Sequence, residues 1–344
     1  MNQLGFFDED RRLKRLSEMG DPLEKIIAYV NWELFRPILK NVFEKRERGV
    51  GGRPAWDCLL MFKILLLQAW YNIADDKTEY MINDRLSFQR FLGLSLGNKV
   101  PDAKTIWLFR DTLSKSGADK ELFALFTVQM ELQGVITHKG SIIDASFVDV
   151  PRQRNSREEN KTIKEGGIPE GWERPENANK LEQKDTDARW AKKNNETHYG
   201  YKDHVKVDAD SKIIVEFEVT NAAVHDSQKL EELIDEKDQE VYADSAYVGE
   251  KLHESVHEQN PEVKLKINEK GYRNRPLTEE QKASNRQKSR TRARVEHVFG
   301  HMTNSMGGLY IRCIGILRAR CIIALKNLAY NLSRYAYLAC AKKA

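Results

Sequence analysis

The spacing of apolar residues changes at about Gly140, and this change constrains the fold more than any other feature. Across residues 21–134 apolar side chains recur every three or four positions, which predicts amphipathic helices. Breaks at the glycine-rich segment 49–52, at 94–101 and at Ser116-Gly117 predict about five of them. We therefore expect residues 1–135 to form an all-helical domain that binds DNA ends or mediates dimerisation.

Short β-branched segments replace the helical pattern after Gly140. Strands are expected at 141–148, 199–207, 213–219, 240–243 and 263–267. The turn-forming residues 208–212 would join the second and third strands as a hairpin. Helices are expected at 226–236, 249–259, 278–299 and 315–338. Three strands followed by alternating helices and strands predict an α/β fold with a mixed sheet in residues 136–344.

A charged segment, residues 152–197, separates the first two expected strands. Its basic and acidic residues nearly balance, and apolar residues are sparse. A segment of this length without clear periodicity is usually functional or disordered. We expect a mobile insertion in the second domain that becomes ordered on a partner.

Several classes of protein are disfavoured by the same sequence. The longest apolar stretch, residues 59–70, is well short of the roughly 20 residues needed to cross a bilayer. Residues 1–20 carry charges throughout, so no secretory signal is expected. The four cysteines are far apart and match neither a disulfide nor a zinc framework. We expect a cytoplasmic protein with no membrane contact.

Basic residues gather between Tyr272 and Arg294, although the net charge of the chain is only +4. The run contains Arg273, Arg275, Lys282, Arg286, Lys288, Arg290, Arg292 and Arg294, against Glu279 and Glu280. Basic residues this dense favour a polyanion such as DNA, because each one placed on a phosphate releases condensed counterions. A solvated basic helix is the alternative explanation.

Three acidic residues stand at places where the expected elements would bring them together. Asp144 follows the apolar start of the first strand, Asp244 follows the fourth, and Glu296 lies on the late basic helix. In this order of elements these positions converge in an RNase H-like layout, where three carboxylates could hold two Mg²⁺ ions about 4 Å apart. Singly, each acid has another explanation: a turn, a helix cap or an ion pair with Arg292. Jointly they favour a metal site.

Five motifs in this region resemble those of bacterial insertion-sequence DDE transposases of the IS-five group. They are Ile142-Ile143-Asp144-Ala145-Ser146-Phe147-Val148-Asp149, Tyr199-Gly200-Tyr201-Lys202-Asp203-His204, Val224-His225-Asp226-Ser227, Ala243-Asp244-Ser245-Ala246-Tyr247 and Arg292-Ala293-Arg294-Val295-Glu296-His297-Val298-Phe299-Gly300. The helical part resembles the usual leader domain of that family. The resemblance implies an RNase H-like catalytic core in which Asp144, Asp244 and Glu296 are catalytic and bind Mg²⁺, with Mn²⁺ as a substitute.

The resemblance also implies a reaction and its partners. A transposase of this kind binds the terminal inverted repeats of its element as double-stranded DNA, cleaves there and joins the freed end to target DNA. It would act in the cytoplasm, associated with the nucleoid, as a homodimer or higher oligomer. We expect DNA contacts from Lys202 and His204 on the second strand and from Lys288, Arg290, Arg292 and Arg294 on the late helix.

Two positions depart from the family pattern, and two other functions stay open. The family usually has Tyr three residues before the Arg of the last motif and Lys seven residues after its Glu, where this chain has Ser289 and Thr303. One alternative function is a Mg²⁺-dependent DNA nuclease on the same core. The other is the product of a decayed element that binds DNA without cutting it.

Overall fold

A computed structural model describes residues 7–43, 54–247, 249–272, 274 and 276–342 of the chain. These residues form two compact units: Met1–Leu125 together with Leu325–Ala344, and Phe126–Ala324. The glycine-rich break at 49–52 and the basic residues Arg273 and Arg275 lie outside the described residues. A functional division at residues 135 and 136 stays a prediction.

The first unit is helical, as the apolar spacing predicts. Its helices are α1 (Asp8–Glu18), α2 (Pro22–Tyr29), α3 (Arg36–Phe43), α4 (Cys58–Tyr71), α5 (Asp75–Asp84), α6 (Leu86–Leu92), α7 (Ala103–Ser116) and the start of α8 (Ala118–Leu132), with a 3-10 turn at Trp32–Phe35. The described residues thus form more helices than the five expected, because extended residues at Val30 and Arg85 interrupt the apolar pattern.

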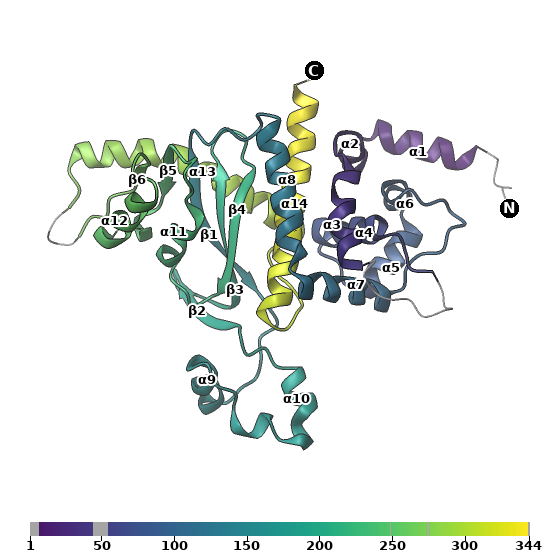
Figure 1. Ribbon diagram of the computed structural model, residues 1–344, viewed down its shortest axis with the longest axis horizontal. Helices are drawn as coiled ribbons and strands as arrows, with labels where there is room; N and C mark the ends of the chain where they lie inside the picture. Colours follow the sequence, from purple (N-terminus) through teal and green to yellow (C-terminus); the bar gives the residue numbers. More distant parts are fainter. Residues whose placement is uncertain (1–6, 44–53, 248, 273, 275, 343–344) are drawn as a thin grey trace. The chain divides into compact units, whose positions relative to one another are not determined.

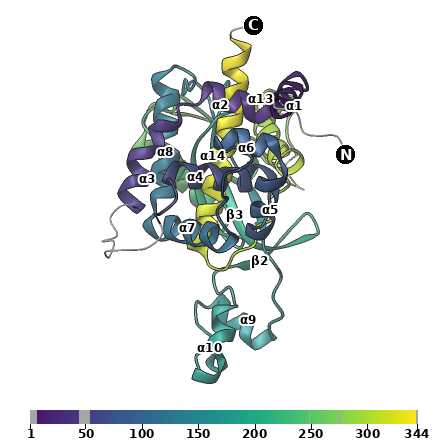
Figure 2. The ribbon, with the colours of Figure 1, turned by 90° about the vertical axis from the view of Figure 1, so that its right-hand side faces the viewer.

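Helix α4 is the centre of this unit. Nearly all its side chains are buried, and it packs among α3, α5, α6 and α7 (Figure 2). The Trp70 indole donates to the carbonyl of Ala329, which lies in the end of α14 (Ile316–Ala341) that belongs to this unit. Asp102 caps α7 by accepting from the Thr105 amide at 2.8 Å.

One finding concerns membranes. Among the described residues no single helix is long and apolar enough to cross a bilayer, and α4 with α5 meets the requirement only as a pair bent by 101°.

The second unit is built on a mixed sheet of six strands. They are β1 (Ser141–Asp149), β2 (Arg189–Lys193), β3 (Glu196–Asp208), β4 (Ile214–Asn221), β5 (Glu240–Ala243) and β6 (Lys264–Ile267) (Figure 1). The order β4-β3-β1-β5-β6 is antiparallel from β4 to β1 and parallel from β1 to β6, with β2 paired to the start of β3. Three antiparallel strands followed by two parallel ones is the RNase H-like arrangement expected from the sequence.

Helices cover both faces of this sheet. Ile143 of β1 packs in a buried cluster with residues of α11 (Leu230–Leu233) and α12 (Glu250–Gln259). Because side chains alternate along a strand, Asp144 points to the opposite face, where α13 (Glu279–Asn304) contacts β1 and β5. The helix expected at 226–236 is shorter, a 3-10 turn at Asp226–Lys229 followed by α11, since Ile234 is extended.

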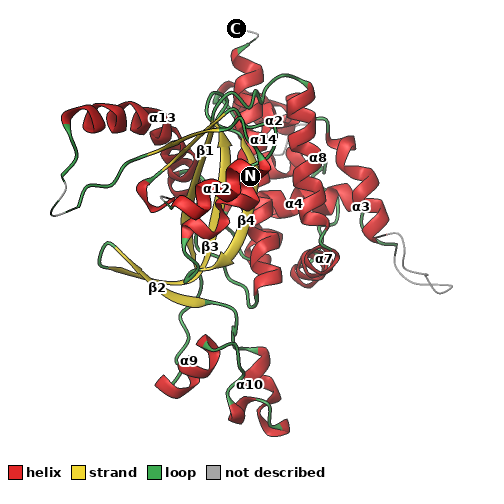
Figure 3. Ribbon diagram, turned by 60° about the vertical axis from the view of Figure 1, so that its left-hand side comes forward, coloured by secondary structure: helices red, strands yellow, loops and turns green. Residues whose placement is uncertain are grey.

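The charged insertion has more internal order than its composition predicts. It contains α9 (Arg157–Lys164), α10 (Ala178–Glu182) and two 3-10 turns, at Glu170–Trp172 and Pro175–Asn177, before β2 (Figure 3). Trp172 is 1% exposed, and its indole donates to Glu159 at 2.7 Å. Ser156 and Glu159 form a capping box at the start of α9. A single buried indole and a capped helix therefore organise this segment, and its mobility stays a prediction.

Candidate active site

The register of the sheet brings the first two acids together. β1 and β5 are parallel, and they pair Ser141 with Val241 and Ile142 with Tyr242. Continuing this register by two residues places Asp244 beside Asp144. The charge of Asp244 accordingly helps to raise the pKa of Asp144. The expected convergence of the first and fourth strands is therefore seen in this structure.

Helix α13 connects the third acid to this pair. The Arg292 guanidinium donates to Asp144 at 3.1 Å and to Glu296, one turn along the helix, at 3.5 Å. Asp144 is largely buried, whereas the Glu296 side chain is 64% exposed. Arg292 thus pairs with two of the three acids, and the third, Asp244, lies beside Asp144. Among the described residues, the oxygens of the three acids do not all fall within 4.8 Å of one another.

Electrostatics at this place favour a bound cation. Burial raises the pKa of Asp144 most, and Asp244 raises it further, against the Ala145 amide and Arg292, which lower it. The pKa of the buried Tyr247 is also raised, by burial first and then by Asp144 and neighbouring carboxylates. Three carboxylates, two of which pair with the single guanidinium, leave an excess of negative charge. Carboxylate oxygens are the ligands that hard divalent cations prefer. The residues present fit such a cation.

The simpler explanations for the single acids are found here too. Asp244 caps a 3-10 turn, Ser245–Tyr247, by accepting from the Ala246 amide at 2.6 Å. Glu296 has its ion pair with Arg292. Asp144, in contrast, lies within β1 and forms no turn, and one of its oxygens accepts from the Ala145 amide at 2.8 Å. These bonds hold the carboxylates in fixed directions, which a metal site also requires.

Sequence reasoning missed one residue of this site. The hydroxyl of Tyr247 is buried and has no hydrogen-bond partner within the described part of the chain. Tyr247 is the last residue of the motif that begins at Ala243, but the resemblance assigned it no role. The motif that supplies Asp244 therefore also supplies a buried hydroxyl three residues further on.

The basic residues of α13 divide into bound and exposed ones. Lys288 donates to the Ile267 carbonyl at 2.9 Å, and Arg294 donates to the Ala209 carbonyl at 2.7 Å. Ser289, at the position of the family Tyr, accepts from Asn268 at 3.0 Å. Arg290 is exposed and has no ion pair with any described residue. This helix is therefore attached to the sheet by part of its basic run.

Lys202 and His204 lie on the face of the sheet away from Asp144. Lys202 pairs with Phe147 across the strands and donates to Asp226 at 2.8 Å. His204 is fully buried, bonds to Thr220 at 2.8 Å, and burial lowers its pKa to about 4. That these two side chains contact DNA stays a prediction. In this structure they lie on a central strand, and Lys202 bonds to the turn before α11.

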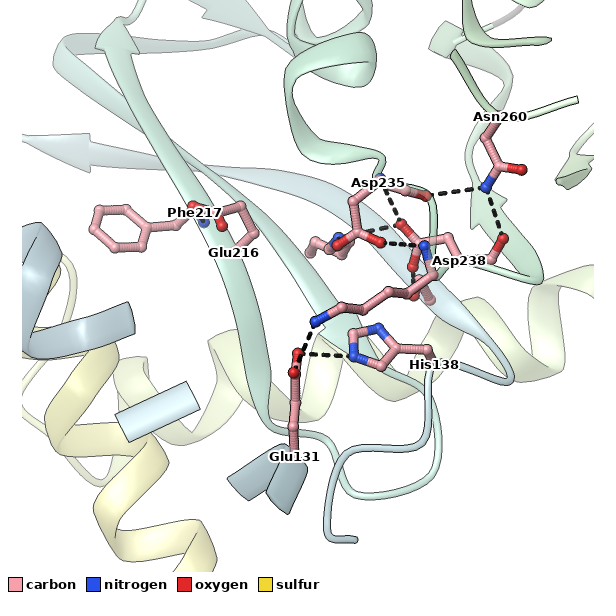
Figure 4. A network of polar contacts seen from close by, with 10 residues as sticks. Glu131, His138, Glu216, Phe217, Asp235, Asp238 and Asn260 are labelled. Atoms are coloured by element: carbon pink, nitrogen blue, oxygen red, sulfur yellow. Dashed lines mark hydrogen bonds and ion pairs between the residues drawn. The ribbon is translucent and has the colours of Figure 1, made fainter. Parts of the chain in front are cut away.

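A second cluster of one histidine and two aspartates has its ligand atoms close enough together to hold a metal ion. Ligand atoms of His138, Asp235 and Asp238 lie within 4.8 Å of one another (Figure 4). However, Lys206 already donates to Asp235 at 2.8 Å and to Asp238 at 3.1 Å. The Lys206 side chain is 1% exposed, so a buried ammonium already occupies the space between these two acids.

The chain matches two family models and resembles a solved structure. Residues 137–332 match a family model described as a transposase DDE domain, and residues 11–112 match one described as a transposase domain (DUF772). Among solved structures, the cryo-EM structure of the piggyBac transposase synaptic complex with hairpin DNA is similar at 12% identity. That match covers 94% of this chain and 76% of the other, with a TM-score of 0.47.

Proposed function

Because this chain belongs to the transposase DDE domain family, we propose that it is the transposase of a bacterial insertion sequence, in the IS-five group. It would bind the terminal inverted repeats of its element, cleave the DNA there and join the freed end to target DNA. The observation that carries the proposal is that Asp244 follows a strand parallel to the one that carries Asp144, and that Arg292 joins Asp144 to Glu296 on α13.

The three acids would hold the divalent ions of the family. Mg²⁺ ions, or Mn²⁺ in their place, would supply activation of the attacking oxygen and stabilisation of the leaving oxygen of a phosphodiester. Asp144 and Asp244 come from neighbouring strands and cannot separate without breaking the sheet. Glu296 is exposed on its helix and can adjust its position when DNA arrives.

Other residues of the chain would bind and position the DNA. Arg292 fixes Asp144 and Glu296 relative to each other while the site waits for its substrate. Arg290, exposed one turn or less from Arg292, would contact a phosphate. The N-terminal helices would bind the element ends or pair two copies into a homodimer or higher oligomer on double-stranded DNA.

Duplex fragments taken from the DNA on both sides of the coding region would test this function. With Mg²⁺ the wild-type protein should release cut ends and form joined products on a second duplex, and Asp144→Asn should do neither while binding within a few-fold of wild type. Cutting without joining would indicate the nuclease. Binding without cutting would indicate a decayed DNA-binding protein, and no specific binding would contradict the proposal altogether.

A further inference from the structure

Strand β2 and the start of β3 form a hairpin at the edge of the sheet (Figure 3). Asn194 and Asn195 both have positive φ, as a two-residue turn of type I′ requires. At the base of the hairpin Gly200 has φ +147°, and a Cβ there would lie 2.4 Å from the Val148 carbonyl oxygen. Only glycine fits this position without a shift of the backbone. We call residues 189–199 the arm.

Ring contacts show which side of the sheet each face of the arm continues. Residues that pair across two strands share a face, so Trp190 lies with Tyr199, and their ring centres are 4.7 Å apart. Steps of two along β3 from Tyr199 lead to the residue that pairs with Asp144. Phe147, whose ring stacks on His198 at 4.1 Å, belongs to the opposite face. The Trp190 face of the arm therefore continues the side of the sheet that carries Asp144.

The same register gives the separation of the arm from the acid site. Tyr199 precedes Val205, the partner of Asp144, by six residues of β3. At about 3.3 Å per residue these span about 20 Å. A duplex rises about 3.4 Å per base pair, so this length corresponds to about six base pairs. A duplex that has one phosphate at Asp144 can therefore also reach the arm.

The Trp190 face carries two cations and no acid. Strand alternation places Lys192 on it, and the Arg152 guanidinium lies 5.7 Å from the centre of the Trp190 ring. All three side chains are exposed, and within the described part of the chain neither cation pairs with a carboxylate. Glu196, the one acidic residue of the arm, pairs with Lys193 on the other face. The Trp190 face therefore has an excess of positive charge.

Arg152 is held in place without losing its charge to a partner. It donates to the Thr197 carbonyl at 3.1 Å, and the Trp190 ring, which itself packs on Tyr199, lies against its guanidinium. A guanidinium has five N–H groups in a plane, so several stay available for the oxygens of an anion. A side chain that is already ordered also loses less entropy when it binds. These contacts suit the recognition of a phosphate group.

We propose that Arg152 and Lys192, on the Trp190 face of the arm, bind the phosphate backbone of double-stranded DNA about six base pairs from the phosphate that is cut. Trp190 is the positioning residue that presents Arg152. The inference rests on the proposed function, to which it adds a DNA-binding surface outside the acid site. Because phosphates carry no sequence information, this surface should bind element ends and unrelated duplexes equally well.

Lys193 provides the matched control, since it is exposed and has the same charge, but its ammonium lies 6.0 Å from the Phe147 ring centre on the other face. Binding to duplexes from the flanking DNA would be measured without divalent metal at several salt concentrations. Arg152→Gln and Lys192→Gln should each bind about tenfold more weakly and lower the slope of log affinity against log salt by about 0.9. Lys193→Gln should resemble wild type. Equal losses in Lys192→Gln and Lys193→Gln would overturn the inference.

A double-mutant cycle tests the role of Trp190. Trp190→Ala removes no charge but should weaken binding, and adding Arg152→Gln to it should cost less than Arg152→Gln costs in wild type. Trp190→Phe, which keeps an aromatic ring under the guanidinium, should restore both the affinity and the full cost of Arg152→Gln. Additive losses would show that Trp190 does not present Arg152.

The place of the contact follows from duplexes in which single phosphates are replaced by neutral methylphosphonates. In wild type and Lys193→Gln, replacements about six base pairs from the cut should weaken binding about tenfold, whereas in Arg152→Gln or Lys192→Gln some of them should cost nothing further. Additive effects at every phosphate, in a wild-type protein that cuts and joins DNA, would refute the arm contact alone. Coupling between these residues and a phosphate in a protein that never cuts would refute the transposase and keep the contact.

Discussion

Two carboxylate clusters lie in the sheet-bearing unit, and β1 contributes to both. On one face Arg292 joins Asp144 to Glu296, and Glu296 is 64% exposed. On the other face Lys206 joins Asp235 to Asp238, where the Lys206 and Asp238 side chains are 1% and 0% exposed. The cation of the first cluster, Arg292, is 23% exposed, whereas that of the second is sealed in the core.

The exposure of the cation distinguishes a candidate metal site from a structural ion-pair network better than the distances between ligand atoms do. Distances alone select His138, Asp235 and Asp238, whose ligand atoms already lie within 4.8 Å. A metal there would have to displace a buried ammonium that makes two short bonds, and a buried charge without a partner is strongly unfavourable. Arg292 also pairs with two carboxylates, but a third, Asp244, lies beside Asp144, so this cluster keeps an excess of negative charge that a cation can balance.

The largest effect should come from the exposed cluster. Asp244→Asn should lower the rate of DNA cleavage by at least about 10³-fold, since it removes a proposed metal ligand. The unfolding free energy should not fall, because the substitution also removes a charge that raises the pKa of Asp144. Single-turnover cleavage and urea denaturation measure the two quantities. Normal cleavage by this variant would show that the acids do not form the catalytic site.

The buried cluster should give the opposite result. Lys206→Met should lower the unfolding free energy by about 3–5 kcal/mol, because Asp238 would be left buried without its cation. Lys237→Met is the control, since its ammonium bonds to Glu131 at 2.8 Å but is 60% exposed, and it should cost about 0–1 kcal/mol.

Urea denaturation of both variants would decide whether the sealed cluster stabilises the fold. If Lys206→Met and Lys237→Met lowered the unfolding free energy equally, the buried ammonium would stabilise the fold no more than an exposed one does. The double variant Lys206→Met with Asp238→Asn should recover most of the lost stability, because it removes the charge together with its partner.

These contrasts also show what the sequence could predict. Asp144 and Asp244 were recognisable because each follows the apolar residues of a strand, and a parallel pair brings such positions together. The hairpin at 208–212 was recognisable from its turn residues, and Asp208 does accept from the Ser211 amide at 2.8 Å. Features of this kind depend on residues that are neighbours in the sequence, so the sequence can predict them.

The burial of Lys202 and His204 could not be predicted in this way. Their spacing of two residues shows that they share a face, but only the position of β3 inside the sheet decides that this face is covered. The same limit applies to Lys288 and Arg294, which bind backbone carbonyls far away in the sequence. In the sequence, a basic residue on a helix looks the same whether its side chain contacts DNA or the sheet of its own domain.

The smallest effect concerns pH and tests Arg292 itself. Asp144 must be ionised to hold a cation, and its pKa is raised by burial and lowered by Arg292. Arg292→Gln should raise this pKa further, so the acid side of the pH profile for cleavage should move to higher pH. Arg286→Gln, which removes the same charge from an exposed position of α13, should leave that side unmoved. The difference between the two variants should shrink in high salt, because added ions screen partly exposed charges. If both variants keep the wild-type profile, Arg292 does not control the ionisation of Asp144. The guanidinium of Arg292 would then affect the pKa of Asp144 no more than that of the exposed Arg286 does.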